Sequence, residues 1–461
     1  MNPINDQNII LDTDSYKSSH FMQYPPSMTR MMSYLESRGG TYPATRFFGL
    51  QYVLKKYLTT RITLEMVEEA GEVLSAHGEP FPLEAWRLIA TELGGKLPLE
   101  IRAVPEGTLV PNHNVLLTCT NTDERFPWLV SWFETMLMRV WYPTTVATQS
   151  YFIRGIIQKA LEESSDDPKG EIAFKLHDFG SRGVSSRESA GIGGLAHLLN
   201  FMGTDTLEAI RMARNYYGAD IAGFSIPAAE HSTVTSWGKE NELEAYRHTV
   251  KMFAKPGALF AVVSDSYDLK HAINEFWGVA LREQVINSGA TLVVRPDSGD
   301  PPAVVRMAVK ALDAKFGHSI NSKGYKVLNH VRVIQGDGIN EDSIKEILAA
   351  IMNDGYSASN VGFGMGGALL QKVDRDTQRF AYKASAGIVG GKYRPIYKDP
   401  VTDPRKRSKD GILDLIPEKG KFRTMQYTDF ASSYPNSVMR TVFRNGELLV
   451  DDNLETIRSR A

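Results

Sequence analysis

The sequence predicts an α/β protein whose larger domain is a β/α barrel. From about residue 150, short apolar runs alternate regularly with helical patterns, which is typical of a parallel sheet. Several of these runs end in polar residues, as residues 292–294 do before Arg295, Asp297 and Ser298. Because a closed barrel brings such strand ends to one mouth, we favour a barrel over an open sheet.

Five strand-like runs with polar or glycine-rich ends are expected in this region. They are residues 171–175, 259–263, 292–294, 331–334 and 360–363. Helices are expected at residues 152–162, 186–201 and 341–352 and around His231. The 341–352 segment places its aliphatic side chains on one face and follows Asn340, a residue type that favours the N-cap position.

The first third of the chain is mixed in character. Strands are expected at residues 8–11, 30–38, 97–104 and 109–118, and helices at residues 48–57 and 63–76. Alternation in the 30–38 segment places Tyr34, Glu36 and Arg38 on one face, which by itself describes an ordinary half-exposed strand. Residues 126–141 are apolar on nearly every face and predict a helix in the core or at a subunit interface.

The regular alternation decays after about Lys383, and we expect the remaining chain to return to the first third. Residues 1–149 with 386–461 are then a composite α+β domain, and residues 150–385 are the barrel domain. The basic run at residues 405–409 is expected to be a solvated loop.

Composition limits the classes of partner. With 461 residues and a formal net charge of -2, nothing global favours nucleic acid or an anionic membrane surface. The single cysteine, Cys119, excludes an intrachain disulfide and fits a reducing compartment, so we expect a cytoplasmic protein. The most apolar stretch, residues 126–141, is interrupted by Glu134 and Arg139 and is too short to span a membrane.

The residues at the strand ends favour a sugar-phosphate ligand. Arg182, Arg295 and Arg375 suit bidentate phosphate contacts. Asp268, Asp297 and Asp337 suit ribose hydroxyls or Mg²⁺, and the glycines at 364–367 allow backbone N–H groups to approach an anion. Neither a Walker-type phosphate loop nor a zinc-hydrolase motif occurs in the sequence. A lone histidine such as His231 is more often structural than catalytic.

Seven motifs, in the same order along the chain, resemble those of the nicotinamide phosphoribosyltransferases, within the type II phosphoribosyltransferases. They are DTDSYK at 12–17, KLHDFGSRG at 175–183, GTDT at 203–206, PAAEHS at 227–232, SDSYD at 264–268, RPDSG at 295–299 and QGDG at 335–338. The resemblance extends from residue 8 to about residue 444. It implies the irregular α/β barrel of that family and a homodimer whose active sites are shared between subunits.

The resemblance also implies roles around the nicotinamide ring. Phe179 would stack on one face of the ring, and the partner subunit's Tyr16 would cover the other face. Asp205 would accept a hydrogen bond from the carboxamide, and Arg182 would contact the carboxamide oxygen. Further substrate-binding residues from the same motifs and their neighbours are Asp14, Ser225 and Ser264.

A second group of residues would bind 5-phosphoribosyl-1-pyrophosphate. Arg295 and Asp297 would bind its ribose and phosphate side. The residues expected around the 5′-phosphate are Gly336, Asp337, Gly366, Gly367 and, from the partner subunit, Arg375. Those expected to meet pyrophosphate or the ATP phosphates are Arg38, Lys383 and Lys398.

The reaction implied is the transfer of phosphoribosyl to nicotinamide, with Mg²⁺ bound to the leaving pyrophosphate. The family couples this transfer to ATP hydrolysis through a phosphohistidine, which here matches His231, with Asp268 as the expected hydrogen-bond partner. Two alternatives stay open: a nicotinate phosphoribosyltransferase of the same fold, and a nucleotide-binding protein without catalytic activity. Asp205 favours nicotinamide over the negatively charged nicotinate.

Overall fold

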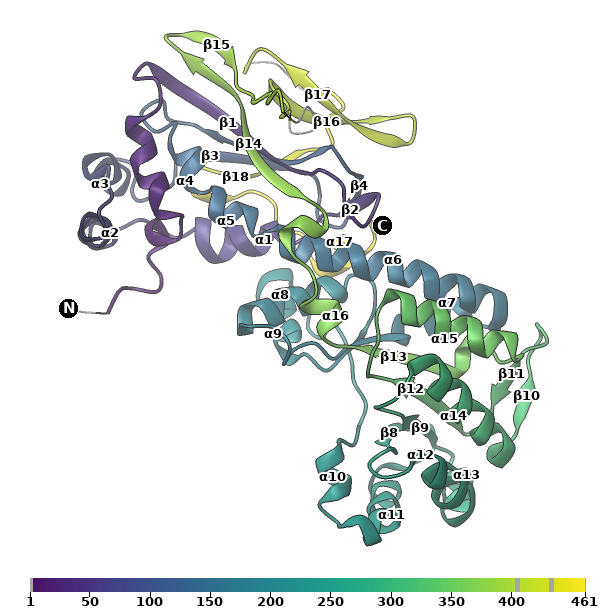
Figure 1. The fold of residues 1–461 in the computed structure, drawn as a ribbon. Coiled ribbons are helices and arrows are strands. Elements are labelled where there is room, and N and C mark those ends of the chain that lie inside the picture. Colours follow the sequence, from purple (N-terminus) through teal and green to yellow (C-terminus); the bar gives the residue numbers. More distant parts are fainter. Residues whose placement is uncertain (1–2, 403–406, 431–434, 461) are drawn as a thin grey trace. The chain divides into compact units, whose positions relative to one another are not determined.

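The computed structural model describes residues 3–402, 407–430 and 435–460 (Figure 1). The chain forms two compact units. Unit 1 consists of Met1–Thr148, Asn215–Ala219 and Asp374–Ala461, and unit 2 consists of Gln149–Arg214 and Asp220–Val373.

Unit 2 contains the predicted parallel sheet. Its six strands follow the order β7-β6-β13-β12-β9-β8, and every named pair in it is parallel. The strands are β6 (Leu176–Asp178), β7 (Gly203–Thr204), β8 (Leu259–Val263), β9 (Thr291–Arg295), β12 (Val331–Gln335) and β13 (Val361–Met365). Their short β-branched runs are largely buried on both faces, as parallel strands covered by helices must be.

The segment 224–228 connects the two edges of this sheet. Phe224 forms a bridge to Gly203 of β7, and Ala228 forms a bridge to Ala261 of β8. The backbone N–H of Ala261 also donates to the carbonyl of Pro227 at 2.9 Å. The sheet therefore curls into an irregular barrel, as the sequence predicts.

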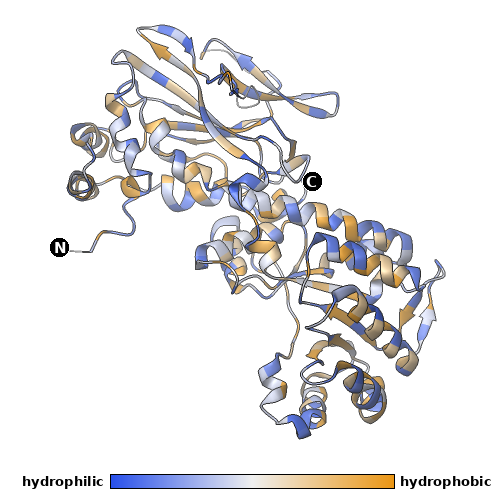
Figure 2. Cartoon of the chain, viewed as in Figure 1, coloured by the Kyte–Doolittle hydropathy of each residue, from blue (hydrophilic) through white to orange (hydrophobic). Residues whose placement is uncertain are grey.

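Helices precede and follow the strands of unit 2 along the chain. They are α7 (Pro168–Glu171), α8 (Arg187–His197), α9 (Leu207–Tyr217), α10 (His231–Thr235), α11 (Glu242–Phe253), α12 (Leu269–His271), α13 (Arg282–Ser288), α14 (Pro301–Phe316), α15 (Glu341–Asn353) and α16 (Gly367–Leu370). α6 (Trp141–Ser164) leads into the unit, and β10 (His318–Ile320) pairs with β11 (Lys326–Leu328). Figure 2 shows hydrophobic strands and helices such as α14 and α15 with one hydrophobic and one hydrophilic side.

The helix predicted at residues 341–352 is confirmed together with its cap. The Asn340 side chain accepts from the N–H groups of Asp342 and Ser343, and the Ser343 hydroxyl accepts from the N–H of Asn340. The aliphatic face of α15 is buried and includes Ile344 and Ile347.

One strand prediction in unit 2 is wrong. Residues 168–174 are helical, with α7 followed by a 3-10 turn at Ile172–Phe174, and β6 begins only at Leu176. Local side-chain contacts explain the difference. Asp167 caps α7 by accepting from the N–H of Gly170, and Lys175 forms an ion pair with Glu171 one helical turn earlier.

Unit 1 is built on an antiparallel sheet of order β15-β14-β1-β5-β3-β18-β19. The strands are β1 (Met28–Ser37), β3 (Leu99–Ala103), β5 (Val115–Asn121), β14 (Phe380–Val389), β15 (Lys392–Pro395), β18 (Arg440–Arg444) and β19 (Glu447–Leu448). Smaller pairs are β2 (Ala44–Arg46) with β4 (Leu109–Pro111), and β16 (Ile412–Glu418) with β17 (Lys421–Tyr427). Three strands from the first part of the chain, β1, β5 and β3, therefore form the centre of the sheet, and strands from the last part flank them on both sides.

The return of the chain to unit 1 begins at Asp374, whereas the sequence-based boundary lies after residue 385. That boundary falls inside β14, which pairs with β1 from Phe380 to Val389. Because a paired strand belongs to the sheet along its whole length, the first half of β14 is part of unit 1.

The helices of unit 1 include two departures from the predictions. They are α1 (Leu50–Val53), α2 (Leu64–His77), α3 (Leu83–Thr91), α4 (Leu129–Trp132), α5 (Glu134–Met138) and α17 (Leu454–Arg458), and α1 continues as a π-helix at Leu54–Leu58. The predicted strand at 8–11 is instead a 3-10 turn, Ile9–Leu11, which the Asn8 side chain caps. The apolar stretch at 126–141 is divided among α4, α5 and the start of α6. Across the described residues, no helix combines the length and apolar character that crossing a membrane requires.

Candidate functional site

The carboxyl ends of all six parallel strands lead directly into residues predicted for the site. Because the strands are parallel, these residues lie at one end of the sheet. They are Phe179 and Arg182 after β6, Asp205 after β7, Ser264 and Asp268 after β8, Arg295 and Asp297 at the end of β9, Gly336 and Asp337 after β12, and Gly366 and Gly367 after β13. Ser225 lies in the segment that connects the sheet edges, and His231 begins α10 just beyond it.

A cavity of about 620 Å³ extends along the inside of the barrel. Its lining includes Thr291 at the beginning of β9 and Arg295 at the end of the same strand. At the strand ends the lining includes Phe179, Asp205 and Ser225. One cavity therefore brings together four of the residues predicted for substrate binding.

The ring of Phe179 forms an apolar wall of the cavity. It packs, with Ile226, against the small cluster of Ala261, Val293 and Ile334. The N–H of Phe179 donates to the carbonyl of Met365 at 3.0 Å, which fixes the turn after β6 to the end of β13. The ring lies so close to Gly364 that a Cβ there would come 1.9 Å from Phe179 Cε2. Only glycine at 364 permits this ring position.

Asp205 and Ser225 form a polar pair beside this apolar wall. The Ser225 hydroxyl donates a short hydrogen bond to Asp205 Oδ1. Asp205 is exposed and lines the cavity. The backbone N–H of Asp205 donates to the carbonyl of Asp178 at 3.0 Å. Asp178 is fully buried, and its Oδ1 accepts from the N–H of Gly180 at 2.7 Å. Burial raises the pKa of the Asp178 carboxyl to about 6. Asp178 thus connects the turn that carries Phe179 with the turn that carries Asp205.

His231 is held by an aspartate that was not among the residues predicted from sequence. Its Nε2 lies 3.1 Å from Asp265 Oδ1, and its Nδ1 lies 3.8 Å from Asp297 Oδ2. Asp265 Oδ2 also accepts from the N–H of Asp297 at 2.9 Å and from the Ser298 hydroxyl at 2.5 Å. Burial opposes the charged form of Asp265, but these hydrogen bonds outweigh burial and hold the pKa of its carboxyl below the usual value.

Two residues after β8 make contacts that differ from the predicted ones. Asp268, expected as the partner of His231, instead caps α12 by accepting from the N–H of His271 at 3.0 Å. Ser264, expected to bind substrate, is fully buried; its hydroxyl accepts from Trp277 Nε1 at 3.0 Å and donates to the carbonyl of Val262. The signal for Asp265 was its position directly after the strand, whereas Asp268 stands where an N-cap is needed.

The glycine turn after β12 lies beside Asp297 and Phe179. A Cβ on Gly336 would come 3.4 Å from Asp297 Oδ1 and 3.5 Å from the Phe179 ring. The residue that follows β12 is therefore close to both side chains. The distance from Arg295 Nε to Asp297 Oδ1 is 3.9 Å. Asp337 is exposed at the same end of the sheet.

The turn at residues 180–183 is adjacent to the other glycine turn. A Cβ on Gly180 would come 3.0 Å from the Gly366 carbonyl oxygen, and one on Gly183 would come 3.6 Å from Gly367 Cα. Arg182 extends from this turn as an exposed side chain. Two backbone turns and one arginine therefore lie at the mouth of the barrel, an arrangement that suits an anionic group.

Six predicted site residues belong to unit 1 and are described within that unit. Asp14 accepts from the Thr135 hydroxyl at 2.7 Å, and Tyr16 is 56 % exposed beside His20. Arg375 lies in an exposed 3-10 turn next to Asp376. The remaining three, Arg38, Lys383 and Lys398, are close to β1 and β14.

The cations near β1 and β14 lie close enough to influence one another. Lys383 on β14 lies opposite Tyr34 on β1. Burial lowers the pKa of the Lys383 amine; the charge of Glu134 opposes this shift, and the positive charges of Arg38 and Lys398 add to it. Arg38 Nε donates to Glu36 Oε1 at 2.9 Å.

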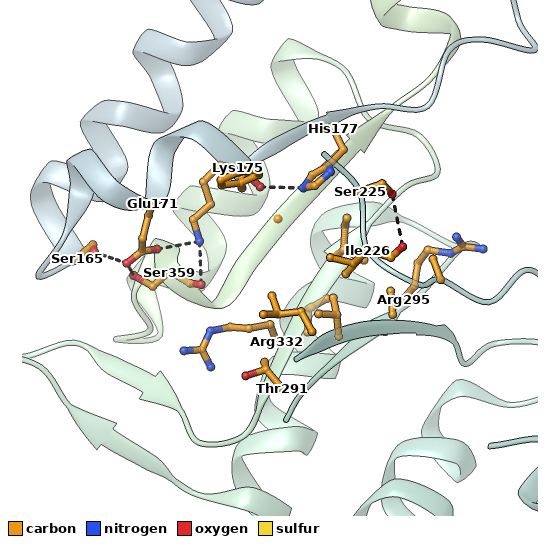
Figure 3. A pocket seen from close by; sticks show the side chains of 18 of the residues that line it. Ser165, Glu171, Lys175, His177, Ser225, Ile226, Thr291, Arg295, Arg332 and Ser359 are labelled. Atoms are coloured by element: carbon orange, nitrogen blue, oxygen red, sulfur yellow. Dashed lines mark hydrogen bonds and ion pairs between the residues drawn. The ribbon is translucent and has the colours of Figure 1, made fainter. Parts of the chain in front are cut away.

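The far end of the barrel cavity contains residues that the sequence did not single out. Figure 3 shows Glu171, Lys175 and Ser359 at one end of the cavity and Ser225 and Arg295 at the other. Lys175 Nζ lies 2.9 Å from Glu171 Oε2 and donates to the Ser359 carbonyl at 2.9 Å. Burial lowers the pKa of the Lys175 amine. Lys175 begins the motif at 175–183, but no site residue was expected here, because the members of this cluster precede β6 and β13 and do not follow them.

A resident metal site is not evident in the described parts of the chain. There, no three His, Cys, Asp or Glu side chains are grouped as the ligands of a metal ion. Asp297 and Asp337 lie at the ends of different strands, β9 and β12.

Comparison with known proteins gives consistent results. The model of the nicotinate phosphoribosyltransferase (NAPRTase) family matches residues 174–447, and the model of the nicotinamide phosphoribosyltransferase N-terminal domain matches residues 8–101. The chain is 55% identical over 458 residues to the nicotinamide phosphoribosyltransferase of Xanthomonas campestris pv. campestris, covering 98% of each chain. It is 32% identical over 497 residues to that of Acinetobacter baylyi, covering 97% of this chain and 95% of the relative.

A solved structure also shares the fold. The nicotinate-nucleotide pyrophosphorylase of Pyrococcus furiosus superposes with a TM-score of 0.63 at 16% sequence identity, covering 100% of this chain and 96% of the other. At this identity the likeness concerns the fold alone.

Proposed function

The chain belongs to the nicotinamide phosphoribosyltransferases, enzymes of NAD salvage, and from this premise we propose how its residues carry out the transfer. The proposed substrates are nicotinamide and 5-phosphoribosyl-1-pyrophosphate, and the products are nicotinamide mononucleotide and pyrophosphate. The observation that carries the proposal is the cavity at the barrel mouth, where the Phe179 ring and the Asp205–Ser225 pair lie on one lining. An aromatic face next to a hydrogen-bond acceptor suits a flat, neutral carboxamide ring.

Nicotinamide would lie against the Phe179 ring, with its carboxamide toward Asp205. The amide N–H would donate to the Asp205 carboxylate, which also accepts from Ser225. Nicotinate, which carries a carboxylate at the same position, would face like charge there. Arg182, on the exposed turn after Phe179, would contact the carboxamide oxygen.

The phosphoribosyl group would lie between Arg295, Asp297 and the glycine turns. As the ring nitrogen of nicotinamide attacks the anomeric carbon, the bond from that carbon to pyrophosphate breaks and positive charge builds on the ribose. The Asp297 carboxylate is suited to stabilise that charge. Backbone N–H groups at Gly366 and Gly367, with Gly336 and Asp337 beside them, would hold the 5′-phosphate.

Mg²⁺ would enter with the pyrophosphate group. The separate carboxylates of Asp297 and Asp337 fit a substrate-borne ion better than a resident one. When bound, Mg²⁺ neutralises charge on the leaving pyrophosphate.

ATP hydrolysis would be coupled to the transfer through His231. Asp265 binds the Nε2 side of the ring, and the imidazole is 45% exposed. We assign Nδ1 as the nucleophile: a bond forms from Nδ1 to the γ-phosphorus of ATP, and the bond to the ADP oxygen breaks. Asp265 fixes the tautomer and supports the positive charge on the phosphorylated ring. Asp268 does not take this role because it is engaged as a helix cap.

The active site would be completed by a second copy of the chain. The partner subunit's Tyr16 would cover the free face of nicotinamide, and the partner subunit's Arg375 would reach the 5′-phosphate. The exposure of both side chains in unit 1 supports this role, since both are available for contact with another subunit. Asp14 would position Tyr16 through its bond to Thr135.

Nicotinate is the alternative substrate, because the family model that matches residues 174–447 bears its name. Turnover of the purified protein with 5-phosphoribosyl-1-pyrophosphate and Mg²⁺, offered nicotinamide or nicotinate with and without ATP, decides between them. Nicotinamide mononucleotide formation stimulated by ATP is expected. In Asp205→Ser the preference should shift toward nicotinate; an unchanged preference would contradict the role of Asp205.

A further inference from the structure

Unit 1 contains a cluster of cations around a buried carboxylate. The members of this β1–β14 cluster are Arg38, Lys383, Lys398 and Lys409, and the carboxylate is Glu36. Glu134 also acts on Lys383 and raises its pKa, but Glu134 is paired with Lys17 at 2.7 Å. The four cations and Glu36 together still carry net positive charge, which adds to burial in lowering the pKa of Lys383. Uncompensated cations in a partly buried site indicate an anionic ligand.

Glu36 is bound by two of these cations through different oxygens. Its Oε1 accepts from Arg38 Nε at 2.9 Å, and its Oε2 accepts a short hydrogen bond from Lys409 Nζ. The Glu36 side chain is 3% exposed, compared with 18% for Arg38 and 23% for Lys409. A buried carboxylate with two charged donors fixes both of them, because releasing either donor leaves the acid poorly compensated.

Lys409 is also fixed through its backbone. Its N–H donates to the Tyr34 hydroxyl at 2.9 Å, and burial together with the charge of Glu36 raises the pKa of Tyr34 to about 12. Tyr34 and Glu36 are neighbours on one face of β1, and Lys383 lies across from Tyr34 on β14. The face predicted from alternation at 30–38 is therefore the surface that gathers the cations.

The basic run at 405–409 is attached to this surface at its end. Lys398 and Ser408 close the base of the loop by two hydrogen bonds, from Lys398 N to Ser408 Oγ and from Ser408 N to Lys398 O, both at 3.0 Å. Residues 405 and 406 lie outside the described residues. Arg407 is exposed, as expected of a solvated loop, whereas the side chain of Lys409 is partly buried.

We propose that Glu36 is a positioning residue for a polyphosphate anion, acting by holding Arg38 and Lys409 side by side in the β1–β14 cluster. The inference rests on the proposed function in one respect, namely that Arg38, Lys383 and Lys398 bind phosphate. The ligand is a diphosphate-bearing anion, which is either the pyrophosphate end of 5-phosphoribosyl-1-pyrophosphate or the phosphates of ATP. Glu36 itself is an acid, so it contributes through the two cations and not by direct contact.

The test uses the opposite signs that charge and positioning predict for Glu36→Gln. If Glu36 contributed only its negative charge, the variant would bind a polyphosphate more tightly. If Glu36 positions its neighbours, the variant should bind one of the two polyphosphate substrates, phosphoribosyl pyrophosphate or ATP, more weakly. The KM for that substrate should rise by about tenfold, with kcat changed less than about twofold. The substrate whose KM rises identifies the anion. An unchanged or lowered KM for both substrates would overturn the proposal.

Binding of inorganic pyrophosphate with Mg²⁺, measured by calorimetry on the full chain, separates this inference from the function on which it rests. Arg38→Ala should weaken binding; if it does not, the phosphate role of the cluster fails. If Arg38→Ala weakens binding but Glu36→Gln does not, the positioning role alone fails. The double variant Glu36→Gln/Lys409→Met should lose less binding than the sum of the two single losses, because both substitutions remove the Glu36–Lys409 contact; fully additive losses would contradict a shared role.

Glu100→Gln is the matched control, because Glu100 lies on β3 of the same sheet and pairs with the exposed Arg444. This control should leave pyrophosphate binding and the KM for each substrate unchanged. Thermal unfolding of each variant shows whether unit 1 remains folded. Should Glu36→Gln fail to fold, Lys409→Met tests the same contact: it should raise the KM for the same substrate, and an unchanged KM would contradict the proposal.

Discussion

Units 1 and 2 place their charged residues on a β-sheet in different ways. In unit 2 the sheet is parallel, and the charged residues follow the strands at one end, so each lies within a few residues of a recognisable apolar run. In unit 1 the sheet is antiparallel, and Glu36 meets a lysine 373 residues further along the chain. Chemistry at strand ends is local in sequence, whereas chemistry on a sheet face depends on which strands pair.

The largest expected effect tests whether unit 1 tolerates a buried acid in the connection between β3 and β4. Glu106 is buried in unit 1, where Oε1 accepts from the N–H of Gln51, and burial raises the pKa of its carboxyl from 4.5 to about 7. A raised pKa in the folded state stabilises the protein below pH 4.5, and this contribution is lost as pH rises through 7. Glu106→Gln should therefore be more stable than the wild type by up to about 3 kcal/mol at pH 8.

The difference between wild type and Glu106→Gln should nearly vanish at about pH 4.5. Urea unfolding at the two pH values, followed by tryptophan fluorescence, measures it, because Trp86, Trp128 and Trp132 form a cluster within unit 1. A pH-independent difference would contradict a titrating Glu106.

The second prediction concerns the unit 2 site, where residue 364 must lack a side chain because the Phe179 ring occupies that space. Gly364→Ala places a methyl group where it would meet the Phe179 ring at 1.9 Å, so the ring must move. The kcat/KM for nicotinamide should fall by about 100-fold, in line with the effect of a misplaced binding group of about 1 Å. Gly362→Ala, on the same strand with its nearest contact at 3.9 Å, is the control and should retain activity. Equal activity in the two variants would show that Phe179 does not define the pocket.

The third prediction separates two aspartates that follow the same strand. Asp265→Asn removes the charged partner of His231 and weakens the contacts to Asp297 and Ser298, so ATP-stimulated turnover should fall by about tenfold or more. Asp268→Asn should retain turnover, because Asp268 caps α12 and an asparagine also caps well. Measuring initial rates with and without ATP distinguishes the two. Loss in Asp268→Asn with none in Asp265→Asn would reverse the assignment.

The smallest expected effect tests whether a helix cap in unit 2 contributes to stability without affecting the site. Asn340→Ala removes the side chain that caps α15, and it should lower the free energy of unfolding by about 1 kcal/mol. Because Asn340 has no proposed contact with substrate, kcat should not change. Chemical unfolding gives the first quantity, and a changed kcat would mean that the cap supports the site.

The parts of the structure that could be predicted from sequence are those fixed by neighbours along the chain. The Asn340 cap and the strands at 259–263 and 331–334 depend on residues next to one another. The strand expected at 171–175 was overridden by the Asp167 cap and the Glu171–Lys175 pair, which make the segment helical. Periodicity does not distinguish a short buried strand from a capped turn of this length.

The site residues divide in the same way, into those that sequence neighbours indicate and those that depend on the path of the chain. Motif positions indicated Phe179, Asp205 and Asp297, and the structure places all three at the ends of parallel strands. Choosing between Asp265 and Asp268 required the path of the chain after β8. Lys409 could not be assigned either, since its partner Glu36 comes from the other end of the sequence.

In unit 1, strands from the last part of the chain flank the strands from the first part, and this order has a consequence for synthesis of the protein. β1 and β5 emerge from the ribosome early, but β14 and β18, which pair with β1 and β3, come only after unit 2 is complete. Two strand edges of the nascent sheet thus stay unpaired while more than half of the chain is still being translated. Nascent unit 1 is therefore expected to be a substrate for chaperones, and unit 2 is expected to fold first.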